Sequence, residues 1–215
     1  MKISNASIDH LVSLIPKTLV HESGKVFYSG RIAFSGKAPL YILGLNPGGN
    51  PEEQALETVE NHTRQVLTEF PDNWSAYRDE IWKGASPGSY GMAPRILHLL
   101  QELGLDPGVV PSSNLIFVRS RREKQIKKRL TTLADLCWPF HAQVLTALSP
   151  RVILCLGSAA GKYVRKKLGA NRLIAEFVEQ NKRRWKSQLF SAPSGFRVVV
   201  ACYTPKHCEL VFSAN

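Results

Sequence analysis

Four short runs of apolar residues stand out in the pattern of hydrophobic and polar positions along the chain. They are 39–45 (PLYILGL), 114–119 (NLIFVR), 151–157 (RVILCLG) and 197–203 (RVVVACY). None of them alternates apolar with polar residues, which is typical of strands buried on both faces of a mostly parallel sheet. We therefore expect a central, mostly parallel sheet of four strands.

Helical patterns fill the intervals between these runs. Residues 51–70 open with Pro and acidic residues, as helix N-termini do, and residues 93–105 carry Leu at helical spacing. A long helical stretch follows at 130–150, with an expected kink at Pro139, and another at 158–169. Strands that alternate with helices in this way predict an α/β fold with three layers, α/β/α.

Residues 171–194 interrupt the alternation. This stretch begins with a helical pattern and turns basic, and its end, RWKSQLFS, has the character of an edge strand or a hairpin arm. We expect this arm to pair with 197–203 across the turn APSG.

The length and composition of the chain predict one domain. It has 215 residues, 44% of them hydrophobic, and we expect a monomer that folds as a single unit over 1–215. Within it we expect an N-terminal helix and lead-in at 1–37, a core at 38–210 and, inside that core, an added helical region at 51–87. We expect no membrane association and no signal peptide, because the chain has no apolar run of about 18 residues and its N-terminal stretch mixes charged with apolar side chains.

The cysteines indicate a reduced compartment. Cys137, Cys155, Cys202 and Cys208 form no CxxC pair, and most of them lie in or beside apolar runs. His207 lies next to the last of them, but a zinc site there would lack a fourth ligand. We therefore expect no metal and no cofactor, and a cytoplasmic protein, or a nuclear one in a eukaryote.

The charge of the chain narrows the class of partner. Lys and Arg number 28 against 17 Asp and Glu, which leaves a net charge of +11 and favours a polyanionic partner. Seven of these basic residues lie in 119–129 (RSRREKQIKKR), together with one acid. Such a run fits a contact with nucleic acid, and it equally fits a solvated loop and helix start.

The loop GLNPGG, which ends the first apolar run, carries candidate chemistry. Gly44 allows a sharp turn, Pro47 stiffens the loop, and the two glycines after it allow backbone N–H groups to approach a ligand closely. The amide of Asn46 both donates and accepts hydrogen bonds, so it is able to hold a water molecule. Two alternatives are a plain Asn-Pro turn and a phosphate-binding loop, although the Lys-Ser/Thr ending of P-loops is missing.

Several stretches, in a consistent order, resemble the motifs of the uracil-DNA glycosylase superfamily. GLNPGG is similar to its first active-site motif, in the Asn-Pro-Gly version of the mismatch-specific and single-strand-selective branches. SYGMAPRILHLLQELGL resembles the loop and Leu-rich helix that follow, and SSNLIFVRSRRE resembles the strand with a base-reading Asn. LADLCWPFHAQVLTALSPRVILCLGSAAGKYV and RVVVACYTPKH are similar to the later helix, strands and last motif. The resemblance covers roughly residues 38–210 and implies the fold of that superfamily.

The resemblance implies a monofunctional DNA glycosylase of base-excision repair, without a cofactor. Such an enzyme flips uracil, or a related deaminated or damaged base, out of single- or double-stranded DNA and hydrolyses its N-glycosidic bond. Asn46 would position the attacking water, because a developing cation needs a well-placed nucleophile more than a strong base. Asn114 would read the flipped base through its amide.

Further residues of the base site follow from the same resemblance. The first motif would supply Gly44, Leu45, Pro47 and Gly48 as substrate-binding residues. An aromatic ring should stack on the base, and Tyr90 in the Gly-flanked loop PGSYGM is the candidate. Phe70 and Trp74 are the alternatives for this role.

The last motif departs from the family pattern. Many members place a His before its Pro, where it stabilises negative charge on the leaving base. Thr204 takes that position here, as a second catalytic candidate that can donate a hydrogen bond but carries no charge. The mismatch-specific branch also lacks the His, so the change does not exclude catalysis, and His207 lies close enough in sequence to substitute for it.

DNA contacts are expected at the same edge of the sheet as Asn46, where a strand of DNA would have to pass. The basic run follows the strand that begins with Asn114, and the N–H groups of the helix after 151–157 are able to bind a phosphate. A tight strand-to-helix turn is the alternative for that helix start. The candidate DNA-binding residues are Arg119, Arg121, Arg122, Ser158, Lys206 and His207.

Two rival functions remain open at this point. The first is a non-catalytic module of the same fold that binds DNA or a nucleobase, because Thr204 replaces the charged helper. The second is a phosphate- or nucleotide-binding α/β protein with no role on DNA.

Overall fold

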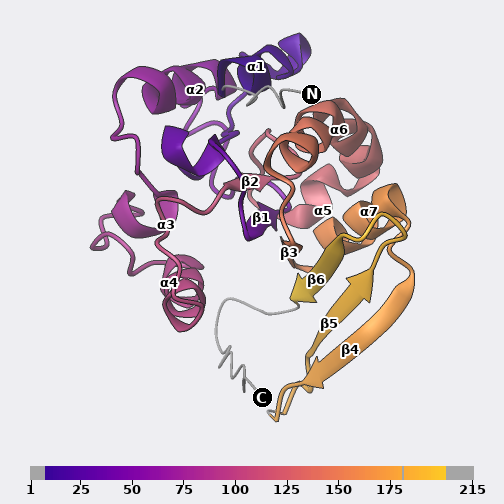
Figure 1. The fold of residues 1–215 in the computed structure, drawn as a ribbon. Coiled ribbons are helices and arrows are strands. Elements are labelled where there is room, and N and C mark those ends of the chain that lie inside the picture. Colours follow the sequence, from indigo (N-terminus) through magenta and orange to yellow (C-terminus); the bar gives the residue numbers. More distant parts are fainter. Residues whose placement is uncertain (1–7, 181, 202–215) are drawn as a thin grey trace.

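The computed structural model describes residues 8–180 and 182–201, which form an α/β fold (Figure 1). Six strands make one sheet in the order β2-β1-β3-β6-β5-β4. The parallel strands are β1 (Leu40–Gly44), β2 (Ser112–Asn114), β3 (Val152–Leu156) and β6 (Arg197–Ala201). Two antiparallel strands, β5 (Lys186–Ser191) and β4 (Arg172–Val178), extend the sheet at one side. The mostly parallel sheet is confirmed, but it has six strands and not four.

Helices cover both faces of this sheet. Among the described residues they are α1 (Ile8–Ser13), α2 (Val59–Thr68), α3 (Ala76–Asp79), α4 (Ala93–Glu102), α5 (Glu123–Ile126), α6 (Leu130–Leu148) and α7 (Ser158–Leu168). Short 3-10 turns lie at Lys17–Leu19, Arg31–Phe34 and Lys127–Arg129. None of the helices in the described ranges is both long and apolar enough to cross a membrane.

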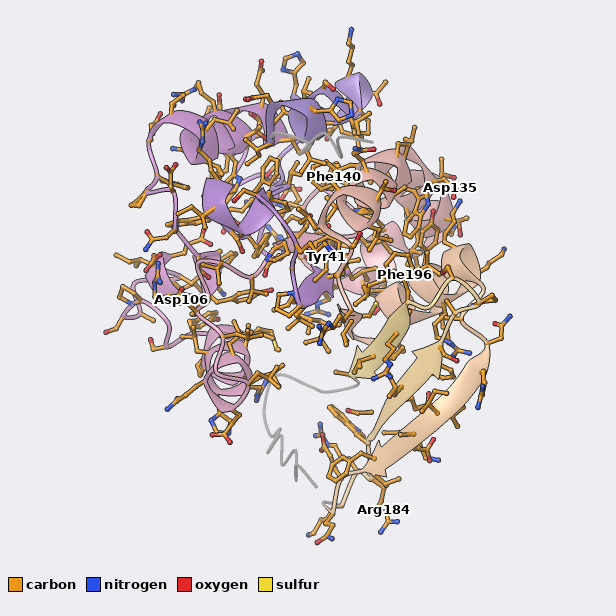
Figure 2. The ribbon with its side chains drawn as sticks, viewed as in Figure 1. Tyr41, Asp106, Asp135, Phe140, Arg184 and Phe196 are labelled. Atoms are coloured by element: carbon orange, nitrogen blue, oxygen red, sulfur yellow. The ribbon has the colours of Figure 1, made fainter. Side chains whose placement is uncertain are left out.

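The two faces of β1 explain why its sequence shows no alternation. Tyr41 and Leu43 pack into one core with residues of α1, α6 and α7, whereas Leu40 and Ile42 pack into another with residues of α3 and α4. All five residues of β1 are buried. Figure 2 shows Tyr41 near the centre of the molecule, and Phe140 of α6 belongs to the same buried cluster. A strand covered on both sides needs apolar residues at every position, as the sequence pattern indicated.

A buried polar pair anchors α6 to this core. The Tyr41 hydroxyl lies 2.8 Å from Nδ1 of His141, and Nε2 of His141 lies 3.2 Å from the carbonyl oxygen of Leu115. A carbonyl oxygen accepts only, so Nε2 carries the proton and Nδ1 accepts from Tyr41. Burial lowers the pKa of His141 to about 4, so the ring is neutral in this position.

A second buried histidine lies on α2. His62 packs against Phe70 and Trp74, with ring centroids 6.2 Å and 6.0 Å away. Neither of its ring nitrogens has a hydrogen-bond partner among the described residues. Burial, together with the nearby positive charges of Lys25 and Arg119, lowers the pKa of His62 to about 3.

The predicted helix at 51–70 is wrong in its first part. Residues 51–57 form turns, and α2 begins at Val59, where the hydroxyl of Thr58 accepts a hydrogen bond from the Asn61 N–H at 3.1 Å. The Pro and the acidic residues indicated a helix start, but the side chain that caps the helix is Thr58. The helices at 93–105, 130–150 and 158–169 are confirmed, and Pro139 lies inside α6.

The second predicted strand is displaced toward the N-terminus. β2 covers Ser112–Asn114, and 115–120 leaves the ladder to run along the loop after β1. The N–H groups of Leu115 and Ile116 donate to the carbonyl oxygens of Gly44 and Leu45, each at 2.9 Å. Asn114 therefore ends its strand rather than beginning one, which places it at the carboxyl edge of the sheet.

The helix expected at the start of 171–194 is a strand instead. β4 pairs with β5 in an antiparallel hairpin, in which Glu176 accepts from Lys186 at 2.8 Å and from Gln188 at 2.7 Å. Cross-strand pairs of this kind stabilise an edge strand whose side chains are exposed. The predicted pairing of 186–191 with the last strand is confirmed. The hairpin extends to one side of the helical layers, with Arg184 close to its tip (Figures 1 and 2).

Candidate functional site

The loop after β1 holds the amide of Asn46 in one orientation. Its Nδ2 donates to the carbonyl oxygens of Pro47 and Val118, at 3.0 Å and 3.2 Å, and to the hydroxyl of Ser120 at 2.9 Å. Two of these partners accept only, so the nitrogen must face them, and Oδ1 points elsewhere. No residue in the described ranges donates to Oδ1. Within the described part of the chain, the side chain is therefore fixed at its donor end and has no partner at its acceptor end.

Asn114 lies beside this loop because of the register of the sheet. Gly44 and Asn114 are direct partners at the ends of β1 and β2. The Asn114 side chain lies over Gly44 so closely that a Cβ at Gly44 would be 2.1 Å from Oδ1 of Asn114. Asn114 is 5% exposed, and its Nδ2 is buried without a hydrogen-bond partner in the part of the chain that is described. An unpaired buried amide is costly, which makes it a candidate for binding a ligand.

Both amides line one pocket of about 310 Å³ at the carboxyl edge of the sheet. This is the size expected for a site that takes a small ligand, and such edges are where α/β folds bind ligands. The other lining residues come from the segment before β1, from the end of β1 and the loop after it, from the segments around α3 and α4, and from the end of β3. They are Tyr28, Gly44, Leu45, Gly48, Ala76, Tyr77, Glu80, Trp82, Tyr90, Gly91, Met92, Ala93 and Leu156.

The pocket therefore brings together most of the predicted substrate-binding residues. Asn46, Asn114, Gly44, Leu45, Gly48 and Tyr90 all line it. Pro47 does not; it is a buried residue of the loop, and its carbonyl oxygen accepts from Asn46 and from the Ser120 N–H. Pro47 acts on the pocket through the shape of the loop.

Aromatic rings are plentiful in the pocket, but two predicted alternatives lie elsewhere. Tyr90 is 43% exposed at the rim, with the ammonium of Lys83 5.9 Å from its ring centroid. Phe70 and Trp74 pack against each other at 4.6 Å, outside the lining. They are core residues and do not reach a base in this pocket. Tyr28, Tyr77 and Trp82 provide rings that the sequence analysis did not select.

Glu80 is the main polar residue that the sequence analysis missed. One of its oxygens, Oε1, is paired with the ammonium of Lys25, which is 3% exposed. The other oxygen, Oε2, is buried and has no hydrogen-bond partner among the described residues. No local sequence signal indicated this pair, because the two residues lie far apart in the chain and neither belongs to a motif.

Glu80 and Asn114 shift the pKa of the Tyr28 hydroxyl in opposite directions. Burial and the Glu80 carboxylate raise the pKa of Tyr28 above its usual value, whereas a polar contact with the side chain of Asn114, too weak in geometry to count as a hydrogen bond of its Nδ2, and the charge of Arg119 lower it. The hydroxyl therefore stays protonated, which makes Tyr28 a hydrogen-bond donor among the residues that line the pocket.

Arg119 does not act as the sequence predicted. Its side chain is fully buried, and its guanidinium donates to Ser23 Oγ at 3.1 Å, to the Gly48 carbonyl oxygen at 2.5 Å and to Glu57 Oε2 at 2.8 Å. These bonds hold the loop after β1 from below. The expected DNA contact is therefore wrong for Arg119, because a guanidinium without exposed surface cannot reach a phosphate.

Other candidate DNA contacts are exposed. Arg121 is 52% exposed and lies 3.1 Å from Glu52 and 3.7 Å from Glu53, and Arg122 is exposed beside it. Ser158 is exposed at the first position of α7, after Gly157, whose φ of +104° favours glycine. These residues follow β2 and β3 and so lie toward the pocket edge of the sheet.

Several predicted residues lie outside the described ranges. These are Thr204, Lys206 and His207, and with them Cys202 and Cys208. Within 8–180 and 182–201 no group of three or more His, Cys, Asp or Glu side chains is arranged to hold a metal ion.

Comparison with known proteins adds no assignment. No protein-family model matches the chain, and no curated protein matches it. What the pocket does must therefore be argued from its own chemistry.

Proposed function

We propose that this protein is a DNA glycosylase that hydrolyses the N-glycosidic bond of a base flipped into the pocket, with a fold of the uracil-DNA glycosylase type. The observation that carries the proposal is the amide of Asn46. Its nitrogen is held by three acceptors while its oxygen has no donor among the described residues, and it lines the same pocket as Asn114, whose Nδ2 has no hydrogen-bond partner in those ranges.

The reaction needs a water molecule in one place. Oδ1 of Asn46 accepts a hydrogen from this water and directs a lone pair of the water oxygen toward C1′ of the sugar. The bond between C1′ and the base nitrogen breaks with its electron pair going to the base, the water oxygen bonds C1′, and the water proton passes to solvent. Because the donor end of the Asn46 amide is fixed, Oδ1 stays in place and can position the water. The reaction then needs no strongly basic side chain.

Asn114 binds the base in this proposal. The Nδ2 group of Asn114 donates to a carbonyl of the base, which satisfies the unpaired amide. A ring of the pocket, with Tyr90 at the rim as candidate, stacks on the base, and stacking of this kind contributes about 1–3 kcal/mol. The apolar lining excludes bulk water from the developing charge.

DNA is the partner in this proposal. The exposed basic residues after β2 lie toward the pocket edge, and the net charge of +11 suits a polyanion. Contacts to phosphates position the strand and leave the choice of base to the pocket.

The experiment is single-turnover release of bases from labelled oligonucleotides that carry uracil, hypoxanthine, xanthine or a thymine mismatch. We expect release by the wild type, and a loss of about 100-fold or more for Asn46→Ala with DNA binding retained. Asn61→Ala is the matched control, because this amide of α2 donates to the Leu56 carbonyl oxygen away from the pocket. Equal rates for wild type and Asn46→Ala would contradict the role of Asn46.

A non-catalytic binding module is the second candidate. The observation that favours it is the unpaired amide of Asn114, which suits recognition of a base without any chemistry. If the wild type binds these oligonucleotides but releases no base from any of them, the protein is a non-catalytic binding module.

A further inference from the structure

The β4–β5 hairpin turns at the same edge of the sheet as the pocket. Leu156, which lines the pocket at the end of β3, is the register partner of Ala201, and Ala201 is the partner of Ser187 in β5. Ser187 in turn pairs with Phe177 of β4. The turn of the hairpin lies beyond this row, because β4 ends and β5 begins there. It is therefore at the carboxyl edge of the parallel strands, where ligands bind in α/β folds.

The tip of the hairpin, defined here as 179–186, is closed by a backbone hydrogen bond. The N–H of Glu179 donates to the carbonyl oxygen of Trp185 at 2.8 Å, one step beyond the last pair of the ladder. The ladder thus continues into the tip, so a hydrogen-bonded turn carries the side chains there. Figure 1 shows this hairpin extending to one side of the helical layers, and Figure 2 labels Arg184 near its tip.

The exposed charge of the described tip residues is all positive. Their exposed charged side chains are Lys182, Arg183, Arg184 and Lys186. The acidic residue of this segment, Glu179, is 5% exposed. The guanidinium of Arg183 lies 5.6 Å from the ring centroid of Trp185, a contact that orients the cation without neutralising it. The tip therefore presents several cations at one place.

Protection of an edge strand does not account for this distribution. Edge strands often carry charges along their length, which prevents pairing with another chain. On β4, however, the exposed residues include Leu173, Ile174 and Phe177, at 49%, 49% and 42% exposure. The positive charge is gathered beyond the strand, at the tip. Exposed cations at one projecting point suit a partner of high negative charge.

The position of the tip fits the backbone of a nucleic acid that enters the pocket. The tip lies three to four strand spacings from β1 in the order of the sheet, which is about 15–20 Å. In duplex DNA this distance corresponds to about five base pairs, at about 3.4 Å for each. A duplex that lies along this edge with its flipped base in the pocket would pass the tip on one side of that base.

Building on the proposed function for the choice of DNA as the partner, we propose that the tip is a second DNA-binding surface. It contacts phosphates about five base pairs from the flipped base, on one side of that base only. Lys182, Arg183 and Arg184 donate to the phosphate oxygens. These contacts position the duplex and extend the footprint in one direction, and they leave the choice of base to the pocket.

The test removes the charge of the tip and keeps the hairpin. The tip variant combines Lys182→Gln, Arg183→Gln and Arg184→Asn. Asn is used at the last position because the φ of Arg184 is +49°, a region that Asn adopts more readily than most residues. Lys186 is left unchanged, because its ammonium donates to Glu176 at 2.8 Å across the two strands.

Two controls accompany this variant. The amino-edge variant combines Arg151→Gln, Arg172→Gln and Arg197→Gln, which removes the same charge at exposed positions of the opposite edge of the sheet. The charge-preserving variant combines Arg183→Lys with Arg184→Lys. It should bind DNA as the wild type does, because an ammonium also binds phosphate.

Binding to DNA is measured by fluorescence anisotropy at several salt concentrations. For a duplex of about 30 base pairs, we expect the tip variant to bind about tenfold more weakly or worse at low salt, and the slope of log affinity against log salt to fall by about 2–3. The reason is that each lost phosphate contact removes the release of about one counterion. The amino-edge variant should keep the slope of the wild type.

Single-turnover release of a base places the contact along the DNA. At protein concentrations below the dissociation constant, the tip variant should be slower than the wild type on a long duplex. Shortening the duplex to about three base pairs from the target base should abolish this difference on one side and leave it on the other. At saturating protein the two rates should be equal, because the tip does not line the pocket.

Each outcome decides the proposal. Equal slopes for the wild type and the tip variant, or equal losses in the tip and amino-edge variants, would overturn it. A charge-preserving variant that loses affinity like the tip variant would also overturn it, because charge would not be the cause. A difference in rate that survives shortening on either side would contradict the placement of the contact.

Two further outcomes separate this surface from the proposed function. If the wild type releases no base, but the tip variant alone loses affinity for DNA, the glycosylase function fails and the DNA-binding tip stands. If the charge of the tip is needed for binding to vesicles of phosphatidylserine and phosphatidylcholine, and not for binding to DNA, the partner is a membrane surface and the proposal is overturned.

Discussion

The side chain of Asn114 lies directly over the backbone of Gly44. The two residues are partners at the ends of neighbouring parallel strands, and a Cβ at Gly44 would come within 2.1 Å of Oδ1 of Asn114. Atoms do not approach so closely, so the missing side chain of Gly44 is what gives Asn114 its place. The glycine and the amide form one structural unit of the pocket.

Gly44→Ala should therefore act as a pocket mutation. The new methyl group displaces the Asn114 amide, and we expect base release to fall by about tenfold or more, as it does when a substrate's hydrogen-bonding group loses its partner. Single-turnover kinetics beside Asn114→Ala measures the effect. Gly48→Ala is the control for the effect on stability. A Cβ at Gly48 meets nothing within 4 Å, so this variant should have the melting temperature of the wild type. Full activity of Gly44→Ala would mean that Asn114 has room to move.

Arg119→Ala should weaken the fold rather than a DNA contact. The substitution leaves the Gly48 carbonyl oxygen and the Ser23 hydroxyl without their buried partner, and we expect a loss of about 1–3 kcal/mol in the free energy of unfolding. Urea denaturation measures it. Arg64→Ala is the control, since the ion pair of Arg64 with Glu69 is exposed and should contribute about 1 kcal/mol at most. Unchanged stability of Arg119→Ala with reduced DNA affinity would restore the phosphate role.

Arg121 and Arg122 should contribute the electrostatic part of DNA binding. Replacing both by Ala is expected to reduce affinity and to lower the slope of log affinity against log salt by about 1–2. A binding titration at several salt concentrations measures the slope. The matched control is Arg151→Ala with Arg197→Ala, which removes the same charge where β3 and β6 begin, at the opposite edge of the sheet. Equal effects of the two double variants would show that only net charge matters.

Acid should destabilise the fold through two buried histidines. The pKa is about 4 for His141 and about 3 for His62, below the ordinary 6.5, so the unfolded chain binds more protons than the folded one below pH 6.5. The free energy of unfolding therefore falls as the pH falls from 6.5 toward 4, by about 3 kcal/mol for each histidine. Denaturation at a series of pH values measures this dependence.

His62→Leu tests the assignment of that slope. Leu fills a similar volume between Phe70 and Trp74, takes no proton and leaves no unpaired ring nitrogen. We expect the difference between wild type and variant to grow as the pH falls below 6.5. His98→Gln, at an exposed position of α4, should follow the wild type at every pH. A constant difference for His62→Leu would assign the acid sensitivity to other groups.

The sheet could be predicted because burial on both faces leaves a trace in the sequence. The runs at 39–45 and 151–157 are apolar throughout, and they form the two central strands β1 and β3. β4 was missed for the opposite reason. Its side chains are exposed on both faces, so its residues carry no pattern, and its pairing with β5 defines it.

The pocket could be predicted in part. Asn46 follows an apolar run, and the carboxyl ends of parallel strands meet at one edge of a sheet, so its place could be predicted. Asn114 was expected to begin its strand, and only the resemblance to the superfamily's motifs indicated that it belongs to the same site. Arg119 was misassigned because a run of basic residues does not show which of their side chains is buried. Glu80 was missed because its meaning depends on Lys25, which is brought to it only by the folded chain.

The three hydrogen bonds of Asn46 have a consequence for attempts to move this site into another protein. Two of the acceptors, Val118 and Ser120, belong to a segment that is remote in sequence from the loop GLNPGG. The six residues of the loop by themselves form a turn, and the orientation of the Asn46 amide depends on Val118 and Ser120, which lie outside the loop. If the loop alone were grafted into another protein, the Asn side chain would lack the acceptors that orient it. The smallest graft expected to keep the orientation of the amide therefore contains both segments.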